Sequence, residues 1–264
     1  MAITISIGLQ KGGVGKTTTT GVVSYILSKK YKVLAVDFDS QGNLTQLLSQ
    51  RPLARFEDQT VLEAIKEGDP KPYIYPIRDN LDLLPADDYL SSLTNFLYQE
   101  YEGARNRALA NTLDKIYDDY DFILIDLPPN LGEHTVNGIV ASNYVLAIMQ
   151  SEPFSFDALR RYIETIEFIK EKVRNDLVFL GILATMADTR TVIDETIIDK
   201  ARKRYGDLVF DTIIKRRSRL KEFSITGIQE DTKQDIEALK PYVSFVKELL
   251  LRVSKEESAR RVVG

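Results

Sequence analysis

The sequence predicts an α/β fold in which a doubly wound, mostly parallel sheet is flanked by helices. Two observations predict it: short, nearly continuous apolar runs recur along the chain, and amphipathic helical patterns lie between them. Apolar runs without alternation are typical of strands that are buried on both faces of a parallel sheet. Because strand and helix alternate, a ligand site is expected at the carboxyl ends of the strands.

The predicted elements follow one another without a visible domain boundary, so residues 1–264 are expected to form one domain. The clearest helix is predicted over residues 159–173, where apolar side chains at helical spacing lie opposite a charged face. A last helix is predicted over 243–253, before a polar stretch, and a short one near 61–66 within an irregular surface excursion at about 51–80. The strands are expected at residues 3–9, 33–36, 81–84, 122–125, 145–149 and 178–184.

Composition and charge exclude several classes of protein. The 264 residues are 44% hydrophobic and 28% charged, which is ordinary for a soluble globular protein. The net charge of −4 excludes a uniformly basic nucleic-acid binder, so binding to phosphate backbones needs a local basic patch. The absence of cysteine excludes disulfides, zinc–thiolate sites and cysteine-ligated iron–sulfur clusters. Without a signal-peptide pattern or a membrane-spanning apolar run, a soluble cytoplasmic protein is expected, with no membrane attachment.

A glycine-rich loop follows the first predicted strand and precedes a helical pattern. Glycines let backbone N–H groups surround phosphates, the helix N-terminus adds positive potential, and Lys16 is expected to reach the β and γ phosphates. Thr17 is expected to offer its hydroxyl to Mg²⁺. This order of elements predicts a P-loop NTPase type of fold with ATP and Mg²⁺ as cofactors. The loop consists of Lys11, Gly12, Gly13, Val14, Gly15, Lys16, Thr17 and Thr18.

Carboxylates stand at the ends of two further predicted strands. Asp37 and Asp39 are two residues apart, so they lie on the same side of an extended chain and are expected to face the metal and the γ-phosphate. We expect Asp39 to position the attacking water and Asp37 to orient the metal shell. The alternative is that one of the two only caps the helix that starts near Asn43. Asp126 ends the run FILID and is followed by two prolines, which predicts a Walker B carboxylate that holds Mg²⁺ through water.

Two groups of basic residues lie in the last third of the chain. A local cluster of cations is what binding to a phosphate backbone requires in a chain of net negative charge. For both groups, a solvated charged face is the alternative. The denser group comprises Lys215, Arg216, Arg217, Arg219 and Lys221, and the second, on a predicted helix, comprises Lys200, Arg202, Lys203 and Arg204.

The motifs KGGVGKTTT, VDFDSQGN and IDLPP together resemble those of the ParA family of partition ATPases, and the likeness extends through most of the chain. The segments LATMADTRT, at 183–191, and RLKE, at 219–222, are similar to two later motifs of that family. The first three motifs also occur in MinD-like relatives, whereas the later two point more narrowly to ParA. Because the glycine-rich loop begins almost at the N-terminus, the chain resembles small members without an N-terminal helix-turn-helix.

The resemblance implies a bacterial, ATP-gated cycle. ATP would join two subunits into a homodimer, in which Lys11, at the position of the deviant Walker A signature lysine, reaches the partner subunit's nucleotide. The dimer would bind double-stranded DNA without sequence preference, and would therefore be nucleoid-associated in the cytoplasm. A ParB-type centromere-binding protein would stimulate a weak, Mg-dependent ATPase.

The resemblance also assigns residues to these steps. Lys11, Lys16 and Asp39 are the expected catalytic residues, and Met186 and Arg216 are candidates for contacts with the adenine. The family's DNA-binding positions correspond to Arg190 and Arg219, and the remaining DNA candidates are Lys215, Arg217 and Lys221.

Other proteins with such a loop have different functions. A MinD-like membrane-cycling ATPase would end in a basic amphipathic helix with bulky apolar residues, and the polar stretch 254–258 with its short tail does not fit that pattern. A redox relative such as the nitrogenase iron protein is excluded because the chain has no cysteine, and a tyrosine kinase with this loop would carry a clustered tyrosine tail. A binding module that never hydrolyses ATP stays open.

Overall fold

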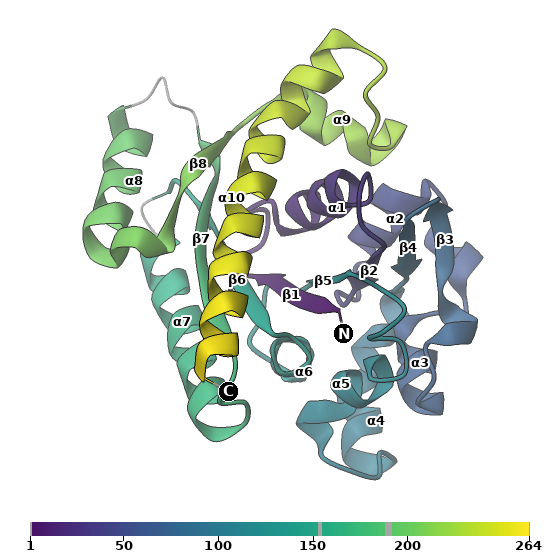
Figure 1. The fold of residues 1–264 in the computed structure, drawn as a ribbon. Coiled ribbons are helices and arrows are strands. Elements are labelled where there is room, and N and C mark those ends of the chain that lie inside the picture. Colours follow the sequence, from purple (N-terminus) through teal and green to yellow (C-terminus); the bar gives the residue numbers. More distant parts are fainter. Residues whose placement is uncertain (1, 153–154, 188–191, 264) are drawn as a thin grey trace.

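The computed structural model describes residues 2–152, 155–187 and 192–263, and its centre is one eight-stranded sheet in the order β3-β4-β2-β5-β1-β6-β7-β8 (Figure 1). Every pairing is parallel except that between β3 and β4. The predicted fold class is therefore confirmed. The strands are β1 Ile3–Gly8, β2 Val33–Asp37, β3 Tyr75–Arg78, β4 Leu81–Leu84, β5 Phe122–Asp126, β6 Tyr144–Gln150, β7 Val178–Ala187 and β8 Val209–Lys215.

The two strands that the sequence did not predict are the two edges of the sheet. An edge strand is covered less completely, so it lacks the continuous apolar run that marks a central strand. β3 alternates half-buried and exposed residues and contains Pro76, while β8 carries the exposed Asp211 in its middle. β3 belongs to the excursion at 51–80, which the sequence left irregular apart from one short helix.

Helices cover both faces of the sheet. On one side α1, α2, α9 and α10 contact one another, and on the other α5 joins α3 to α6, which contacts α4 and α7 (Figure 1). The helices are α1 Lys16–Leu27, α2 Asn43–Ser49, α3 Val61–Glu67, α4 Leu93–Gln99, α5 Ala108–Leu113, α6 Glu133–Val140, α7 Ser155–Lys172, α8 Val192–Tyr205, α9 Ser218–Thr226 and α10 Lys233–Val263. Short 3₁₀ helices lie at Leu53–Phe56, Lys71–Tyr73, Asp88–Ser92, Arg105–Arg107 and Gly206–Leu208.

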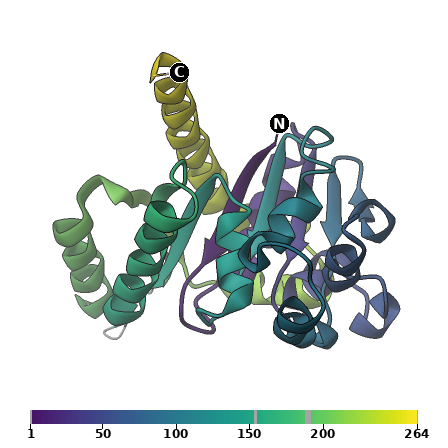
Figure 2. The same cartoon turned by 90° about the horizontal axis from the view of Figure 1, so that it is seen from below.

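The last helix is much longer than predicted, since α10 runs through the polar stretch that was expected to follow it. Its buried side chains recur at helical spacing and continue to Val253, after which Glu257 accepts a hydrogen bond from the Tyr144 hydroxyl and Arg260 donates to the carbonyl of Asp176. These polar contacts tie the turns around Glu257 and Arg260 to the rest of the protein. Figure 2 shows α10 projecting past the sheet on the side of the N-terminus. Of the helices in the described residues, none is long and apolar enough to cross a membrane.

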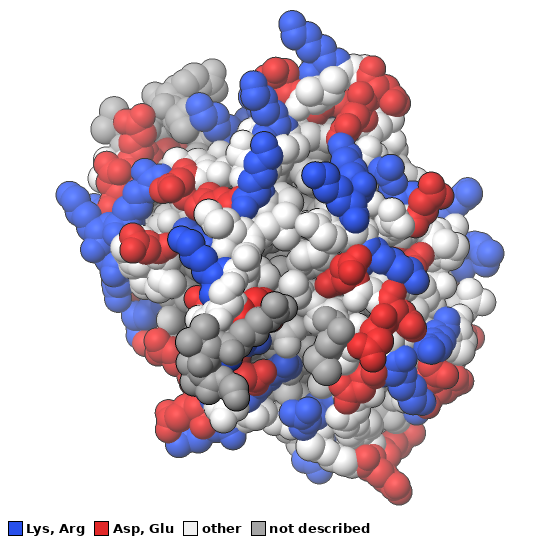
Figure 3. Space-filling view, viewed as in Figure 1, with Lys and Arg blue, Asp and Glu red and all other residues white. Residues whose placement is uncertain are grey.

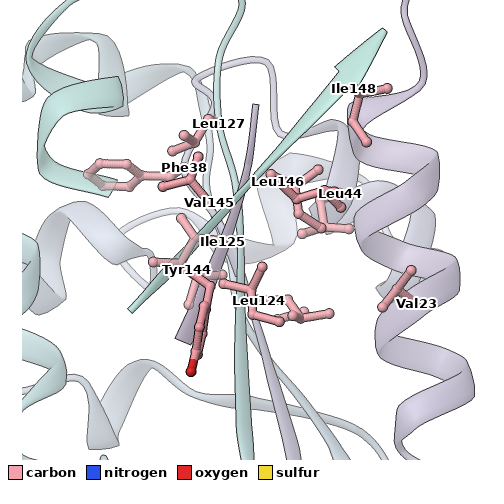
Figure 4. Packing of buried hydrophobic residues seen from close by; sticks show 14 of the residues in the cluster. Val23, Phe38, Leu44, Leu124, Ile125, Leu127, Tyr144, Val145, Leu146 and Ile148 are labelled. Atoms are coloured by element: carbon pink, nitrogen blue, oxygen red, sulfur yellow. The ribbon is translucent and has the colours of Figure 1, made fainter. Parts of the chain in front are cut away.

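The core packs against the central strands β5, β1 and β6. Side chains of β5 and β6 such as Leu124 and Leu146 lie on the side of the sheet that faces α1 (Figure 4) and belong to the same buried cluster as Val23. At the end of β1 the packing demands a glycine, because a Cβ on Gly8 would fall 2.1 Å from the hydroxyl oxygen of Tyr162. Tyr162 of α7 thus packs against the end of β1, just before the glycine-rich loop, and supports the backbone there.

Candidate functional site

The glycine-rich loop leaves the carboxyl end of β1 and enters α1 at Lys16. Gly13 and Gly15 have φ of 74° and 91°, a left-handed conformation that favours glycine. Gly15 is the N-cap of α1 and so provides no side-chain cap, and the first turn of the helix carries no acidic residue. The first backbone N–H groups of α1 are therefore free of a side-chain cap, and together with the helix dipole they provide the positive potential that phosphate binding requires.

The two lysines of the loop have different environments. Lys16 is 6% exposed, and its ammonium group donates a hydrogen bond of 2.9 Å to the carbonyl oxygen of Lys11. Burial lowers the pKa of Lys16, while the nearby carboxylates of Asp126 and Asp39 act in the opposite direction. Lys11 instead points to the end of β6, where its ammonium group lies 2.5 Å from a carboxylate oxygen of Glu152. Lys16 therefore lies inside the loop and Lys11 at its outer edge.

Asp126 and Thr17, two of the residues predicted to hold Mg²⁺, are in direct contact. The Thr17 hydroxyl donates to one oxygen of Asp126 at 2.7 Å, and the Thr20 hydroxyl donates to the other at 3.1 Å. Burial raises the pKa of Asp126 to about 7, although the Thr17 hydrogen bond and Lys16 lower it. One carboxylate and one hydroxyl suit Mg²⁺, which keeps several waters and takes further oxygens from the phosphates of its nucleotide. The described residues contain no cluster of three or more His, Cys, Asp or Glu side chains that could hold a metal ion.

Asp37 lies beside Asp126, because the parallel register of β2 and β5 pairs the two positions. It is fully buried, and one of its oxygens accepts both the backbone N–H and the hydroxyl of Thr45, each at 2.8 Å. Burial, followed by the charge of Asp126, raises the pKa of Asp37 to about 8. Asp37 thus binds the N–H of Thr45 in the first turn of α2, a contact that fits the capping alternative without excluding a second role. Its role in the metal shell stays a prediction.

Asp39 lies beyond the end of β2 and is half-buried, facing the loop closely enough for its charge to act on Lys16. One of its oxygens accepts the backbone N–H of Gln41 at 3.1 Å. This contact fixes the direction of the carboxylate. The position beyond the strand is the one expected of a group that orients water next to the terminal phosphate.

A small pocket adjoins the start of α1 and unites two distant parts of the chain. The adenine candidates Met186 and Arg216 both line it, together with Gly15 and Thr18 of the loop. Met186 has a φ of 53°, which is strained for a side chain of its kind. The pocket is also lined by Thr185, Ile214, Lys215, Arg217, Leu220, Lys221 and Tyr242.

Four residues of the basic cluster, Lys215, Arg216, Arg217 and Lys221, line this pocket, and the cluster continues into α9. Lys215, Arg217 and Lys221 are exposed, whereas Arg219 is held by the carboxylates of Asp235 and Glu222. Arg190 lies outside the described residues. On the face that Figure 3 shows, basic and acidic side chains are interspersed, so the proposal of a phosphate-binding surface rests on the cluster around the pocket.

Sequence reasoning missed several residues of this site. Thr20 and Glu152 both had a signal: Thr20 lies one residue beyond the loop motif in the run TTTT, and Glu152 is the first acidic residue after a buried strand. Thr185 donates its hydroxyl to the Val14 carbonyl at 2.6 Å, and Tyr242 of α10 lies 3.3 Å from the Thr19 hydroxyl. These two contacts join segments far apart in sequence, and no local pattern predicts them.

Comparison with known proteins places the chain among ATPases. Residues 2–179 match a family described as an AAA domain. The chromosome-partitioning ATPase Soj of Treponema pallidum is 36% identical over 225 residues, which cover 83% of this chain and 85% of that protein. The chromosome partitioning protein ParA of Myxococcus xanthus is 32% identical over 267 residues, which cover 98% of this chain and 91% of that protein.

Solved structures agree with this result. The apo McdA structure from Cyanthece superposes with a TM-score of 0.83 and 26% identity, covering 95% of this chain and 100% of that one. A cobyrinic acid a,c-diamide synthase from Mycobacterium smegmatis, solved with a bound ATP analogue and magnesium, has a TM-score of 0.81 and 28% identity, covering 95% and 94%. The fold is thus shared by proteins of different activity.

Proposed function

The chain belongs to the ParA family of partition ATPases, and from this premise we propose that it is an ATP-gated switch that partitions DNA in the bacterial cytoplasm. ATP binding joins two copies of the chain, the dimer binds double-stranded DNA without sequence preference, and a ParB-type partner stimulates hydrolysis. The DNA-bound dimer is nucleoid-associated. Hydrolysis separates the two copies and releases the DNA.

One observation carries this proposal: the pocket at the start of α1 is lined both by the loop residues Gly15 and Thr18 and by Lys215, Arg217 and Lys221. A nucleotide bound to the loop would lie beside Lys215, Arg217 and Lys221, which are also exposed at the surface. Occupancy of the loop can thus alter the position of those cations directly. When two copies meet, the number of cations facing DNA doubles, and affinity rises with each added phosphate contact.

The chain's own residues provide the catalytic groups. The glycine loop and the N-terminus of α1 hold the phosphates, and Lys16 stabilises the charge that develops on the transferred phosphoryl group. Asp39 orients the attacking water. Mg²⁺, when bound by Thr17 and Asp126, neutralises charge on the phosphate oxygens. Lys11 of each copy reaches the nucleotide that is bound to the other copy.

The membrane-cycling alternative gains no support from the C-terminal helix. The turns of α10 around Glu257 and Arg260 are tied to Tyr144 and to the carbonyl of Asp176. A lipid-binding helix would present a continuous apolar face away from the protein. The synthase reaction of the structural relative also stays with that protein, because the partitioning proteins are more similar in sequence and match most of the chain.

The test combines ATPase assays with gel filtration. The rate of ATP hydrolysis is measured with and without nonspecific duplex DNA, and the size of the protein is compared in Mg-ATP and Mg-ADP. We expect a dimer in ATP, a monomer in ADP and a rate that responds to DNA. A monomer in both states with the same rate would refute the proposal, and ATP-dependent sedimentation with anionic vesicles without DNA binding would support the membrane alternative instead.

A further inference from the structure

One buried ion pair ties α9 to the start of α10. The Nε of Arg219 donates to the Asp235 carboxylate, whose side chain is fully buried, and Nη1 donates to Glu222 at 2.8 Å. The guanidinium also lies over the ring of Phe223, with 5.3 Å between its carbon and the ring centroid. Only 18% of the Arg219 side chain is exposed. Arg219 is therefore engaged on several sides within one protomer.

Asp235 uses its second oxygen to cap α10. That oxygen accepts the backbone N–H of Thr232 at 2.8 Å and the Thr232 hydroxyl at 2.7 Å, and the same hydroxyl accepts the N–H of Asp235. Burial raises the pKa of Asp235, but the hydrogen bonds from Thr232 and Arg219 outweigh it and hold the pKa below its usual value. The carboxylate is thus ionised and fully satisfied, with one oxygen directed at each helix.

The pair lies under a hollow that is lined by residues of both helices. Arg216 and Arg217, which precede α9, line it, and Lys233, the first residue of α10, lines it as well. All three are exposed. The Arg219–Asp235 pair fixes how these cations are spaced, because it is the charged contact that joins the first turns of the two helices.

We propose that Arg219 and Asp235 form a clamp that positions the cations of this surface for DNA, and that Arg219 is a positioning residue which makes no phosphate contact of its own. The inference rests on the proposed DNA binding. A phosphate that drew the guanidinium group of Arg219 away from Asp235 would leave this buried carboxylate without its cation, and an unpaired buried charge is strongly destabilising. The exposed Arg216, Arg217 and Lys233 can bind phosphate without that loss.

The experiment compares two substitutions that each remove one negative charge beside the same guanidinium. Asp235→Asn breaks the buried contact, and Glu222→Gln, whose side chain is 51% exposed, is the matched control. DNA affinity is measured for the full chain in Mg²⁺ with a non-hydrolysable ATP analogue, using a fluorescent nonspecific duplex at several salt concentrations. Hydrogen exchange of α9 amides is followed in parallel. Arg219→Lys is a second variant in case Asp235→Asn does not fold.

A direct phosphate contact by Arg219 and a clamp predict opposite changes in the DNA affinity of Asp235→Asn. If Arg219 contacts phosphate directly, both charge removals tighten DNA binding and Arg219→Lys retains it. If Arg219 is a clamp, Glu222→Gln binds DNA as well as the wild type or slightly more tightly. Asp235→Asn and Arg219→Lys then weaken binding about tenfold or more, because removal of a single phosphate interaction weakens binding about tenfold near 0.1 M salt. Tighter binding by Asp235→Asn overturns the clamp.

Hydrogen exchange of the α9 amides tests the clamp independently of DNA binding, and so independently of the proposed function. Faster exchange of α9 amides in Asp235→Asn, with normal exchange in Glu222→Gln, supports the clamp as a holding contact even if the wild type binds no DNA. In that case the proposed function fails by itself. Unchanged exchange in α9 overturns the clamp, whatever the DNA result.

Discussion

The ion pair between Lys11 and Glu152 leads to a prediction about dimerisation. In the structure, the lysine that is proposed to reach the partner's nucleotide is bound to a carboxylate of its own protomer, and the Gln150 side-chain amide donates to the other oxygen of that carboxylate at 2.6 Å. Each copy must break this contact before the dimer forms. Glu152→Gln removes the negative charge and keeps the shape, so it should strengthen ATP-dependent dimerisation.

The expected magnitude follows from the exposure of the pair. The side chains of Lys11 and Glu152 are 26% and 46% exposed, and an ion pair of this kind contributes about 0.2–1 kcal/mol. Because a dimer requires the release of two such pairs, the total gain is about 0.4–2 kcal/mol. This corresponds to a dimer dissociation constant that is about 2- to 30-fold lower.

The assay is sedimentation velocity over a range of protein concentrations, in Mg²⁺ and a non-hydrolysable ATP analogue. Glu164→Gln is the control, since it breaks a surface pair with Arg160 on α7, whose side chains are 55% and 48% exposed, that the dimer has no need to release. Its dimer constant should equal that of the wild type. If Glu152→Gln dimerises no better than the wild type, or less well, Glu152 does not restrain Lys11, and a contact of Glu152 within the dimer becomes the better explanation.

Three further predictions test the nucleotide site. Lys16→Ala removes a buried cation from the phosphate cradle and should weaken ADP binding by about 3 kcal/mol, or more than about 100-fold, in calorimetric titration; near-normal affinity would refute the role of the loop. Asp39→Ala should lower the ATPase rate about 100-fold or more while a long-lived ATP dimer persists, so brisk turnover would move the water-orienting role elsewhere. In EDTA, thermal stability should fall as pH rises from about 4 to 8. The pKa of Asp126 is raised to about 7 and that of Asp37 to about 8, so the folded state binds these two protons more tightly than the unfolded chain does. This stabilisation is fully present below the pKa of the unfolded chain and is lost above the pKa of the folded state. Asp126→Asn should make thermal stability depend less on pH, and an equally steep dependence in that variant would contradict the raised pKa of Asp126.

The central strands and the loop could be predicted from the sequence because their signals are local. A run such as FILID needs no partner to be recognised as a buried strand, and KGGVGKTT specifies both its backbone conformation and its chemistry. The edge strands β3 and β8 could not be predicted in this way, since their burial depends on a single neighbouring strand and on helices distant in sequence.

The same distinction applies to the site. The sequence could place Asp37 and Asp126 at strand ends, but not show that Thr45 would bind one while Thr17 would bind the other, because register and helix packing decide those contacts. Likewise, the sequence singled out Arg219 as a DNA-binding candidate but could not show that a carboxylate 16 residues away holds its guanidinium group. Charge clustering is a local property, whereas the availability of each charge is not.

ATP-gated DNA binding is measured with a fluorescent nonspecific duplex and the wild-type protein, in Mg²⁺ with a non-hydrolysable ATP analogue and in Mg-ADP, over a range of salt. We expect binding in the ATP state that weakens steeply with salt, by a slope of about 0.9 for each phosphate contact, and binding in the ADP state that is weaker by about tenfold or more. Equal affinity in the two states, or an affinity that salt does not change, would contradict ATP-gated DNA binding.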